Sequence, residues 1–157
     1  NLYMITYRIV HKDYMHDNSG HGARLCGGRL NPPGVACIYT SAHLSLCLLE
    51  KMVHAQALKD MCDLALMKFS VIESDKIYTV DRDQLKDGWE SDFNYTQWLG
   101  GQILENGNYW GFIVPSIILP EEENILLLPD AIGKTDIMLS SADLFQVDPR
   151  LSGLFKK

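Results

Sequence analysis

Residues 22–50 bring together the residue types that could break a glycosidic bond in a dinucleotide. The segment Gly22–Gly34 reads Gly-Ala-Arg-Leu-Cys-Gly-Gly-Arg-Leu-Asn-Pro-Pro-Gly, which sets arginines among glycines. Tyr39 follows, and Glu50 is the only acidic residue between positions 17 and 60. Arginine forks hold phosphates, glycines let a ligand approach the backbone, and a carboxylate stabilises a developing cation.

Such a set suits cleavage of the bond between nicotinamide and ribose in NAD. The leaving group already carries a positive charge, so no general acid has to protonate it. The transition state needs a carboxylate near the oxocarbenium-like ribose, a firm hold on the pyrophosphate and an oriented nicotinamide ring. Neither a pair of acids nor a metal ion is required.

Each of these residues also has an ordinary structural interpretation. As a functional residue, Glu50 would hydrogen-bond the ribose 2′-hydroxyl and offset the positive charge that develops at the anomeric carbon. As a structural residue, it would be a solvated helix glutamate beside Lys51. Arg29 would grip the pyrophosphate, or pair with a nearby carboxylate. Tyr39 ends a strand of β-branched residues, and an aromatic side chain at that position could equally lie in the core or at the mouth of a pocket. Ser116, in an apolar strand, either is satisfied by the sheet or points into a pocket.

Length and charge limit the kind of protein. At 157 residues the chain is expected to be one domain over 1–157, and its net charge of −6 argues against direct nucleic-acid binding. It contains no apolar run of about eighteen residues and does not start like a signal peptide, so we expect no membrane association and a cytoplasmic protein. Residues 18–49 contain no acidic residue and two arginines. These arginines either form a local binding site for an anion or lie close together in the sequence by chance.

The four cysteines, at positions 26, 37, 47 and 62, form no Cys-x-x-Cys pair. No two histidines have the spacing of metal ligands either. Three of the cysteines have apolar neighbours, which favours buried free thiols over ligands or disulfides. We therefore expect no metal site and no resident cofactor.

The elements that must position these residues read as many strands with two main helices. Strands are predicted over residues 3–10, 35–40, 64–73, 76–80, 109–119 and 124–128. Helices are predicted over residues 42–59, with Ser41 as N-cap, and 94–105. Residues 17–34 read as a long loop or loose hairpin, and those after 128 as irregular or short-strand structure. We assign an α+β fold, since no Gly-x-Gly-x-x-Gly fingerprint supports a Rossmann domain.

Seven short motifs follow one another along the chain: Tyr7-Arg8, Gly27–Asn31, Pro33-Gly34, Tyr39–Ser41, Leu48–Glu50, Val114–Ser116 and Glu123-Asn124. Together they resemble the RES-domain family, toxins of bacterial toxin–antitoxin pairs that are named for an arginine, a glutamate and a serine. The family pattern has tyrosine-arginine, Gly-Gly-Arg-Trp-Asn, Pro-Gly, Tyr-x-Ser, a leucine-rich helix ending in glutamate, Val-Pro-Ser and Glu-Asn. The resemblance covers nearly the whole chain.

The resemblance implies an ADP-ribosyltransferase-like fold, with a mixed, mostly antiparallel sheet, flanking helices and a central cleft for NAD. It implies depletion of NAD as a substrate, with water, phosphate or a protein side chain as acceptor. It also implies an Xre-type antitoxin that blocks the cleft, and a homodimer. By this mapping Glu50, Arg29 and Tyr39 are catalytic, and Arg8, Arg29, Tyr39 and Ser116 bind the dinucleotide.

Two positions depart from the family pattern. Leu30 stands where the family usually has tryptophan, and Leu128 stands before Pro129 where asparagine is usual. The first removes a large aromatic residue from beside the pocket, and both leave the charged residues in place. Two alternatives to NAD degradation stay open: transfer of ADP-ribose to a protein, and a catalytically weakened module that binds NAD.

Overall fold

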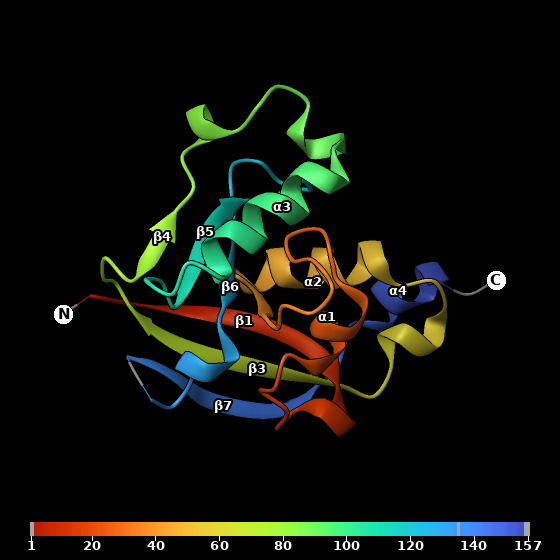
Figure 1. Cartoon of the computed structure of the whole chain (residues 1–157). Helices are drawn as coiled ribbons and strands as arrows, with labels where there is room; N and C mark the ends of the chain where they lie inside the picture. The colour runs from red at the N-terminus through yellow and green to blue at the C-terminus, as the bar shows by residue number, and fades with distance from the viewer. Residues whose placement is uncertain (1, 135, 156–157) are drawn as a thin grey trace.

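A seven-stranded mixed sheet forms the centre of the computed structural model, which describes residues 2–134 and 136–155 (Figure 1). The strand order is β4-β5-β6-β2-β1-β3-β7, with β4 parallel to β5 and the other neighbouring pairs antiparallel. The strands are β1 (Tyr3–His11), β2 (Ile38–Ser41), β3 (Leu64–Ile72), β4 (Ile77–Thr79), β5 (Gly111–Pro115), β6 (Glu123–Leu127) and β7 (Ile137–Phe145).

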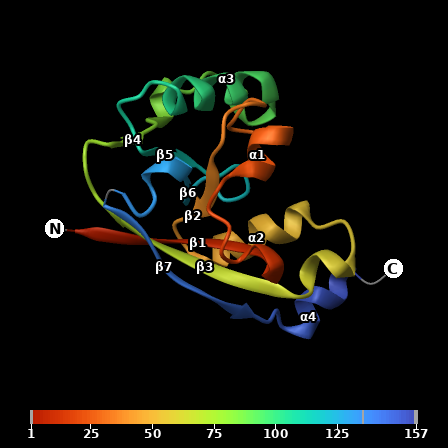
Figure 2. The same ribbon diagram turned by 60° about the horizontal axis from the view of Figure 1, so that its bottom comes forward.

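Within the described residues, four α-helices flank this sheet. They are α1 (His21–Cys26), α2 (Leu44–His54), α3 (Phe93–Leu104) and α4 (Pro149–Ser152). Figure 2 shows β1, β3 and β7 side by side in a curved layer, with α1 and α3 far above it. The α+β class predicted from the sequence is confirmed. No helix of the described residues is long and apolar enough to cross a membrane.

The sheet opens between β1 and β2. These two strands share a single residue pair, Tyr7 with Ser41, whereas β1 pairs with β3 along its whole length. Next to that pair, the side chain of Arg8 in β1 links the two strands, because its Nη1 donates a hydrogen bond to the Tyr39 carbonyl of β2 at 3.1 Å. One residue pair and the Arg8 hydrogen bond therefore join β1 to β2 at this point of the sheet.

Helix α2 lies against one face of the sheet beside this opening. Cys47 is buried with Ile9 of β1 and with Leu64 and Leu66 of β3. Burial of Cys47 fixes the rotation of the helix about its axis. Glu50, three residues later on the same face, is thereby directed toward the opening.

Helix α3 packs against the segment Gly22–Gly34, called here the glycine-rich segment. Two adjacent glycines in α3, Gly100 and Gly101, are buried, and a β-carbon built on Gly100 would lie 1.7 Å from the Leu30 carbonyl oxygen. The same construction on Gly101 would lie 3.1 Å from Pro32. A helix with larger side chains at these two positions could not approach the segment so closely.

Several elements were predicted with wrong boundaries. The first long helix begins at Leu44 after His43, and Ser41 is the last residue of β2 instead of its N-cap. This helix ends at His54, because Ala55 takes an extended backbone conformation. The predicted loop 17–34 contains the short helix α1, and the strand predicted over 109–119 ends at Pro115.

The C-terminal part differs most from its prediction. Residues after 128 contain β7, a nine-residue strand paired with β3, and the short helix α4. Strand β7 forms an edge of the sheet, and only its first residue, Ile137, is buried. An edge strand so exposed carries little of the apolar alternation from which a strand is predicted.

Candidate active site

A cavity of about 450 Å³ occupies the opening between β1 and β2. Four of the predicted site residues line it, namely Arg8, Arg29, Tyr39 and Glu50. Ser116, the fifth, is fully buried behind the wall and reaches the cavity through its hydrogen bond to Glu50. Residues distant in the sequence, from β1, the glycine-rich segment, β2, α2 and the end of β5, thus converge on one site.

Glu50 is fixed in the wall of the cavity by two neutral donors. Its Oε1 accepts a hydrogen bond from Ser116 Oγ at 3.1 Å and another from Asn124 Nδ2 at 2.7 Å. Its Oε2 has no hydrogen-bond partner within residues 2–134 and 136–155. The glutamate is half-buried and held in place, which differs from a freely solvated helix residue beside Lys51.

Ser116 stands where β5 stops. Pro115 ends the strand, and Ser116 Oγ accepts hydrogen bonds from the backbone N–H groups of Ile118 and Leu119, at 3.1 and 3.2 Å. With both acceptor directions in use, the hydroxyl hydrogen is free to point to Glu50. The serine therefore acts as a fixed donor to the carboxylate.

Asn124 belongs to the site although it was not predicted there. Its amide nitrogen donates to Glu50, and its Oδ1 accepts from Ser41 Oγ at 2.8 Å. Ser41 and Asn124 are partners in the β2–β6 ladder, so the strand register brings them together. The one signal in the sequence was the Glu123-Asn124 motif of the resemblance.

Tyr39 lines the cavity with its ring while its hydroxyl is engaged elsewhere. The hydroxyl donates to Asn31 Oδ1 at 2.5 Å and accepts from the Leu30 N–H at 3.1 Å. Burial raises the pKa of this phenol above its ordinary value. Gly28 packs on the hydroxyl, and a β-carbon there would lie 2.5 Å from it. Tyr39 thus holds the glycine-rich segment in shape.

The two arginines differ in exposure. Arg8 is half-buried, and desolvation lowers its pKa, although a guanidinium remains charged at neutral pH. Arg29 is exposed, and its Nη1 donates to the Glu90 carbonyl at 3.0 Å while the guanidinium lies 5.8 Å from the centre of the Phe93 ring. Neither arginine forms an ion pair with a carboxylate among the described residues.

The two residues that depart from the family pattern, Leu30 and Leu128, lie at different hollows of the molecule. Leu30 is 7% exposed, lines the cavity and packs in a core cluster with residues of α3 and β5. Leu128 is half-buried and lies outside the cavity, at a second hollow near Pro129. Leu30 therefore leaves the lining less aromatic, whereas Leu128 does not line the cavity.

The cysteines are free, but only two of them are buried. Cys37 and Cys47 are buried, whereas Cys26 and Cys62 are exposed, so the expectation of buried thiols holds for two of the four cysteines. Across the described part of the chain, no group of three or more His, Cys, Asp or Glu residues could hold a metal ion.

The sequence profile of the RES domain matches residues 5–144. The chain belongs to the RES-domain family. It is 34% identical over 152 residues to "Toxin Res" of Yersinia enterocolitica, covering 94% of this chain and 99% of that protein. A "Toxin Res" of Photorhabdus laumondii is also 34% identical, over 82% of this chain and 83% of its own length.

A third relative and a solved structure extend the comparison. The "Prs ADP-ribosylating toxin" of a Sphingobium species is 29% identical over 86% of each chain. The crystal structure of the MbcT–MbcA toxin–antitoxin complex of M. tuberculosis matches with a TM-score of 0.74, over 98% of this chain and 89% of that one. At 20% identity, this second likeness shows that the RES protein shares the fold.

Proposed function

We propose that this RES protein is the toxin of a toxin–antitoxin pair and that it breaks the nicotinamide–ribose bond of NAD. The observation that carries the proposal is the Glu50 carboxylate, held by Ser116 and Asn124 in a cavity that also contains two arginines. Because both donors bind Oε1, Oε2 stays available to a ligand. Curated relatives that are named as toxins support the toxin part of the proposal.

In the proposed reaction the bond between C1′ of the ribose and the pyridinium nitrogen breaks. The bonding electrons go to the nitrogen, so nicotinamide leaves neutral without a proton. Glu50 offsets the positive charge that develops on the ribose, and Arg8 and Arg29 hold the pyrophosphate. An oxygen of the acceptor then attacks C1′, and the proton that this oxygen carried passes to solvent water. Tyr39 shapes the cavity with its ring, since its hydroxyl is occupied.

The first prediction follows from the charge of Glu50. In Glu50→Gln the size of the side chain is kept and the negative charge is lost, so NAD consumption should fall about a hundredfold or more. Purified protein is incubated with NAD, with and without phosphate, and the products are separated by chromatography. ADP-ribose indicates water as acceptor, and ADP-ribose 1″-phosphate indicates phosphate.

The matched control is Glu121→Gln, which removes an exposed carboxylate outside the cavity. This variant should consume NAD at the parent rate. Consumption of NAD by Glu50→Gln at the parent rate would show that the assignment of Glu50 is wrong. Absence of NAD consumption by the unaltered protein would refute the proposed reaction.

Transfer of ADP-ribose to a protein is the second candidate. It is favoured by the relative named "Prs ADP-ribosylating toxin", which is 29% identical to this chain. The two reactions share the first bond cleavage and differ in the acceptor. Incubation of the protein with labelled NAD and cell lysate separates them, because transfer gives a labelled protein band and degradation gives free ADP-ribose or its phosphate.

The same proposal includes the partners. We place the toxin in the cytoplasm as a homodimer, inhibited by an Xre-type antitoxin that blocks the cavity. The similar fold of a protein solved in a toxin–antitoxin complex supports an antitoxin partner. Light scattering of the purified chain tests the dimer, and NAD consumption in the presence of the co-expressed antitoxin tests the inhibition.

A further inference from the structure

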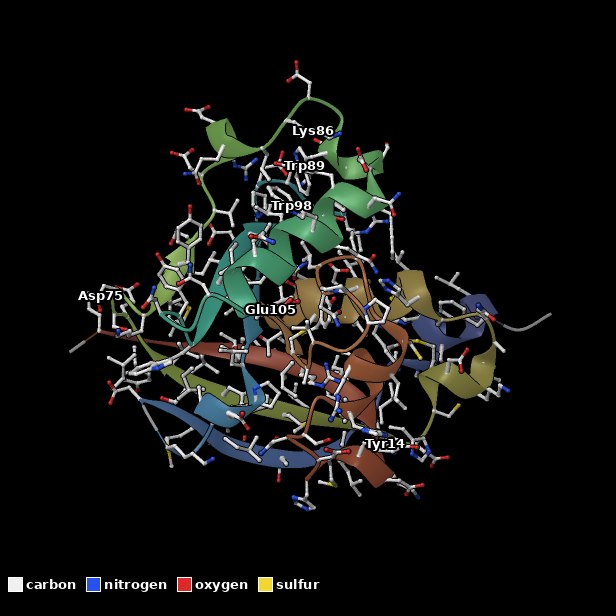
Figure 3. The ribbon with its side chains drawn as sticks, in the orientation of Figure 1. Tyr14, Asp75, Lys86, Trp89, Trp98 and Glu105 are labelled. Carbon is white, nitrogen blue, oxygen red and sulfur yellow. The ribbon has the colours of Figure 1, made fainter. Side chains whose placement is uncertain are left out.

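Trp89 is an aromatic residue of the cavity that the reaction above does not use. It lines the cavity and is half-buried, in a short 3-10 turn, Trp89–Ser91, that belongs to the segment between β4 and α3. In Figure 3, Trp89 lies on this segment at the top of the view, with Trp98 below it on α3. The local sequence motifs gave this tryptophan no role.

The segment that carries Trp89 is tied down on both sides of the indole. Arg29 Nη1 donates to the carbonyl of Glu90, the next residue, and the Arg29 guanidinium faces the Phe93 ring. Lys86 forms an ion pair with Asp92, whose Oδ1 also accepts from the Tyr95 N–H at 3.0 Å and caps α3. The position of Trp89 is thus coupled to Arg29, the residue proposed to hold the pyrophosphate.

The other candidates for a stacking surface are less suitable. Tyr39 is anchored through its hydroxyl to Asn31 and Leu30, and Tyr7 belongs to β1 and packs against a core cluster. Leu30 stands on the cavity wall without a π face. Among the aromatic residues that line the cavity, Trp89 has the largest ring and comes from outside the sheet.

We propose that Trp89 is a substrate-binding residue whose indole stacks on a planar ring of the dinucleotide. It thereby supplies the aromatic surface that Leu30 does not provide. This inference rests on the proposed function. Arg29 keeps further N–H donors besides the one given to Glu90, so it can bridge the pyrophosphate and the segment that carries the indole. Binding of phosphate and stacking of the ring would then support each other.

The kinetic test compares three variants. Because stacking of a base on an aromatic residue is worth enough to change affinity about tenfold, Trp89→Ala should raise the KM for NAD about tenfold. If the stacked ring is adenine, kcat should change much less, because adenine is remote from the bond that breaks, whereas stacking on nicotinamide should lower kcat as well. Trp89→Phe should restore most of the affinity, because it keeps a π face. Trp98→Ala, at an α3 residue 58% exposed and outside the cavity, should match the parent.

A spectroscopic test does not depend on turnover. ADP-ribose contains the adenine ring and nicotinamide mononucleotide contains the nicotinamide ring, so each is titrated separately while indole fluorescence is recorded. We expect one of them to quench the emission of the parent and of Trp98→Phe, and not that of Trp89→Phe. The ligand that quenches identifies which ring the indole meets. Quenching by neither, or equal quenching in Trp89→Phe, overturns the inference.

The two proposals fail in different ways. If the parent protein does not consume NAD, the proposed function is wrong, whatever Trp89 does. If the parent consumes NAD and Trp89→Ala has the same KM as Trp98→Ala, the proposed function stands and the role of Trp89 is refuted. A Trp89→Phe variant as impaired as Trp89→Ala also refutes stacking, since a phenyl ring should replace the indole in part.

Discussion

The state of Glu50 depends on the neutral donors around it. A hydrogen bond to a charged group contributes about 1.5–3 kcal/mol, and Glu50 Oε1 accepts two. Both donors are themselves fixed, Ser116 by two backbone N–H groups and Asn124 by Ser41. A carboxylate held in this way needs little reorganisation when positive charge develops in front of it.

Asn124 offers a test of this arrangement. In Asn124→Ala the carboxylate loses a donor, so kcat for NAD should fall between about tenfold and a hundredfold at every pH. The kcat of Asn124→Ala and of the parent, measured side by side, checks the prediction. A kcat equal to that of the parent would contradict it.

The sequence predicted the charged residues of the site better than the neutral ones. Glu50 is the single acid in a long stretch, and Arg29 follows two glycines, so both stand out without any fold. Asn124 carries no charge, and its place depends on its pairing with Ser41 across β2 and β6. No local pattern encodes that register, because it is set by how two distant segments meet.

At the scale of elements, α3 and the glycine-rich segment are in close contact where Gly100 meets the Leu30 carbonyl. Glycine inside a helix costs about 1 kcal/mol relative to alanine. At Gly100 this cost is offset because the Leu30 carbonyl occupies the place of a side chain. The same contact sets the position of Arg29, the residue before Leu30.

Gly100→Ala should therefore lower the free energy of unfolding by about 2 kcal/mol or more, since the added methyl group meets backbone that cannot retract easily. Gly22→Ala is the matched control, because Gly22 is exposed in α1 and its β-carbon would meet nothing within 4 Å. That variant should be neutral, or more stable by up to about 1 kcal/mol. Urea unfolding of both variants measures the difference, and equal stabilities would contradict the packing described here.

Elements were predicted well where burial imposes a pattern. In β3, from Met67 to Ile72, fully buried side chains alternate with partly exposed ones, and the predicted range of the strand is nearly correct. Only the first residue of β7 is buried, so the existence of this strand depends on pairing with β3 and not on its own side chains. The start of α2 was misplaced because Ser41 resembles an N-cap, while its hydroxyl is used by Asn124.

At the scale of the whole molecule, an acidic protein carries a basic cavity. The net charge is −6, yet the cavity lining contains Arg8, Arg29 and Lys51 against the single carboxylate of Glu50. Clefts of one sign concentrate ligands of the other sign. The same arrangement explains how an anionic dinucleotide could bind to a chain whose overall charge would repel it.

Folding also places two thiols in separate core clusters, one near each half of the sheet. Cys37 packs beside α3 and β5, and Cys47 beside β1 and β3. Burial raises the pKa of each thiol from 9.0 to about 12. Between these values the unfolded chain has lost protons that the folded protein keeps, so the free energy of unfolding falls as pH rises.

Each buried thiol should lower the free energy of unfolding by about 1.4 kcal/mol per pH unit above pH 9, and Tyr39 should add to the fall at higher pH, because burial also raises its pKa. Urea unfolding at a series of alkaline pH values measures this slope. Cys26→Ser with Cys62→Ser, at the two exposed positions, should keep the slope, whereas Cys37→Ala with Cys47→Ala should flatten it. A free energy of unfolding that stays constant above pH 9 would mean that the two thiols are not buried in the folded protein.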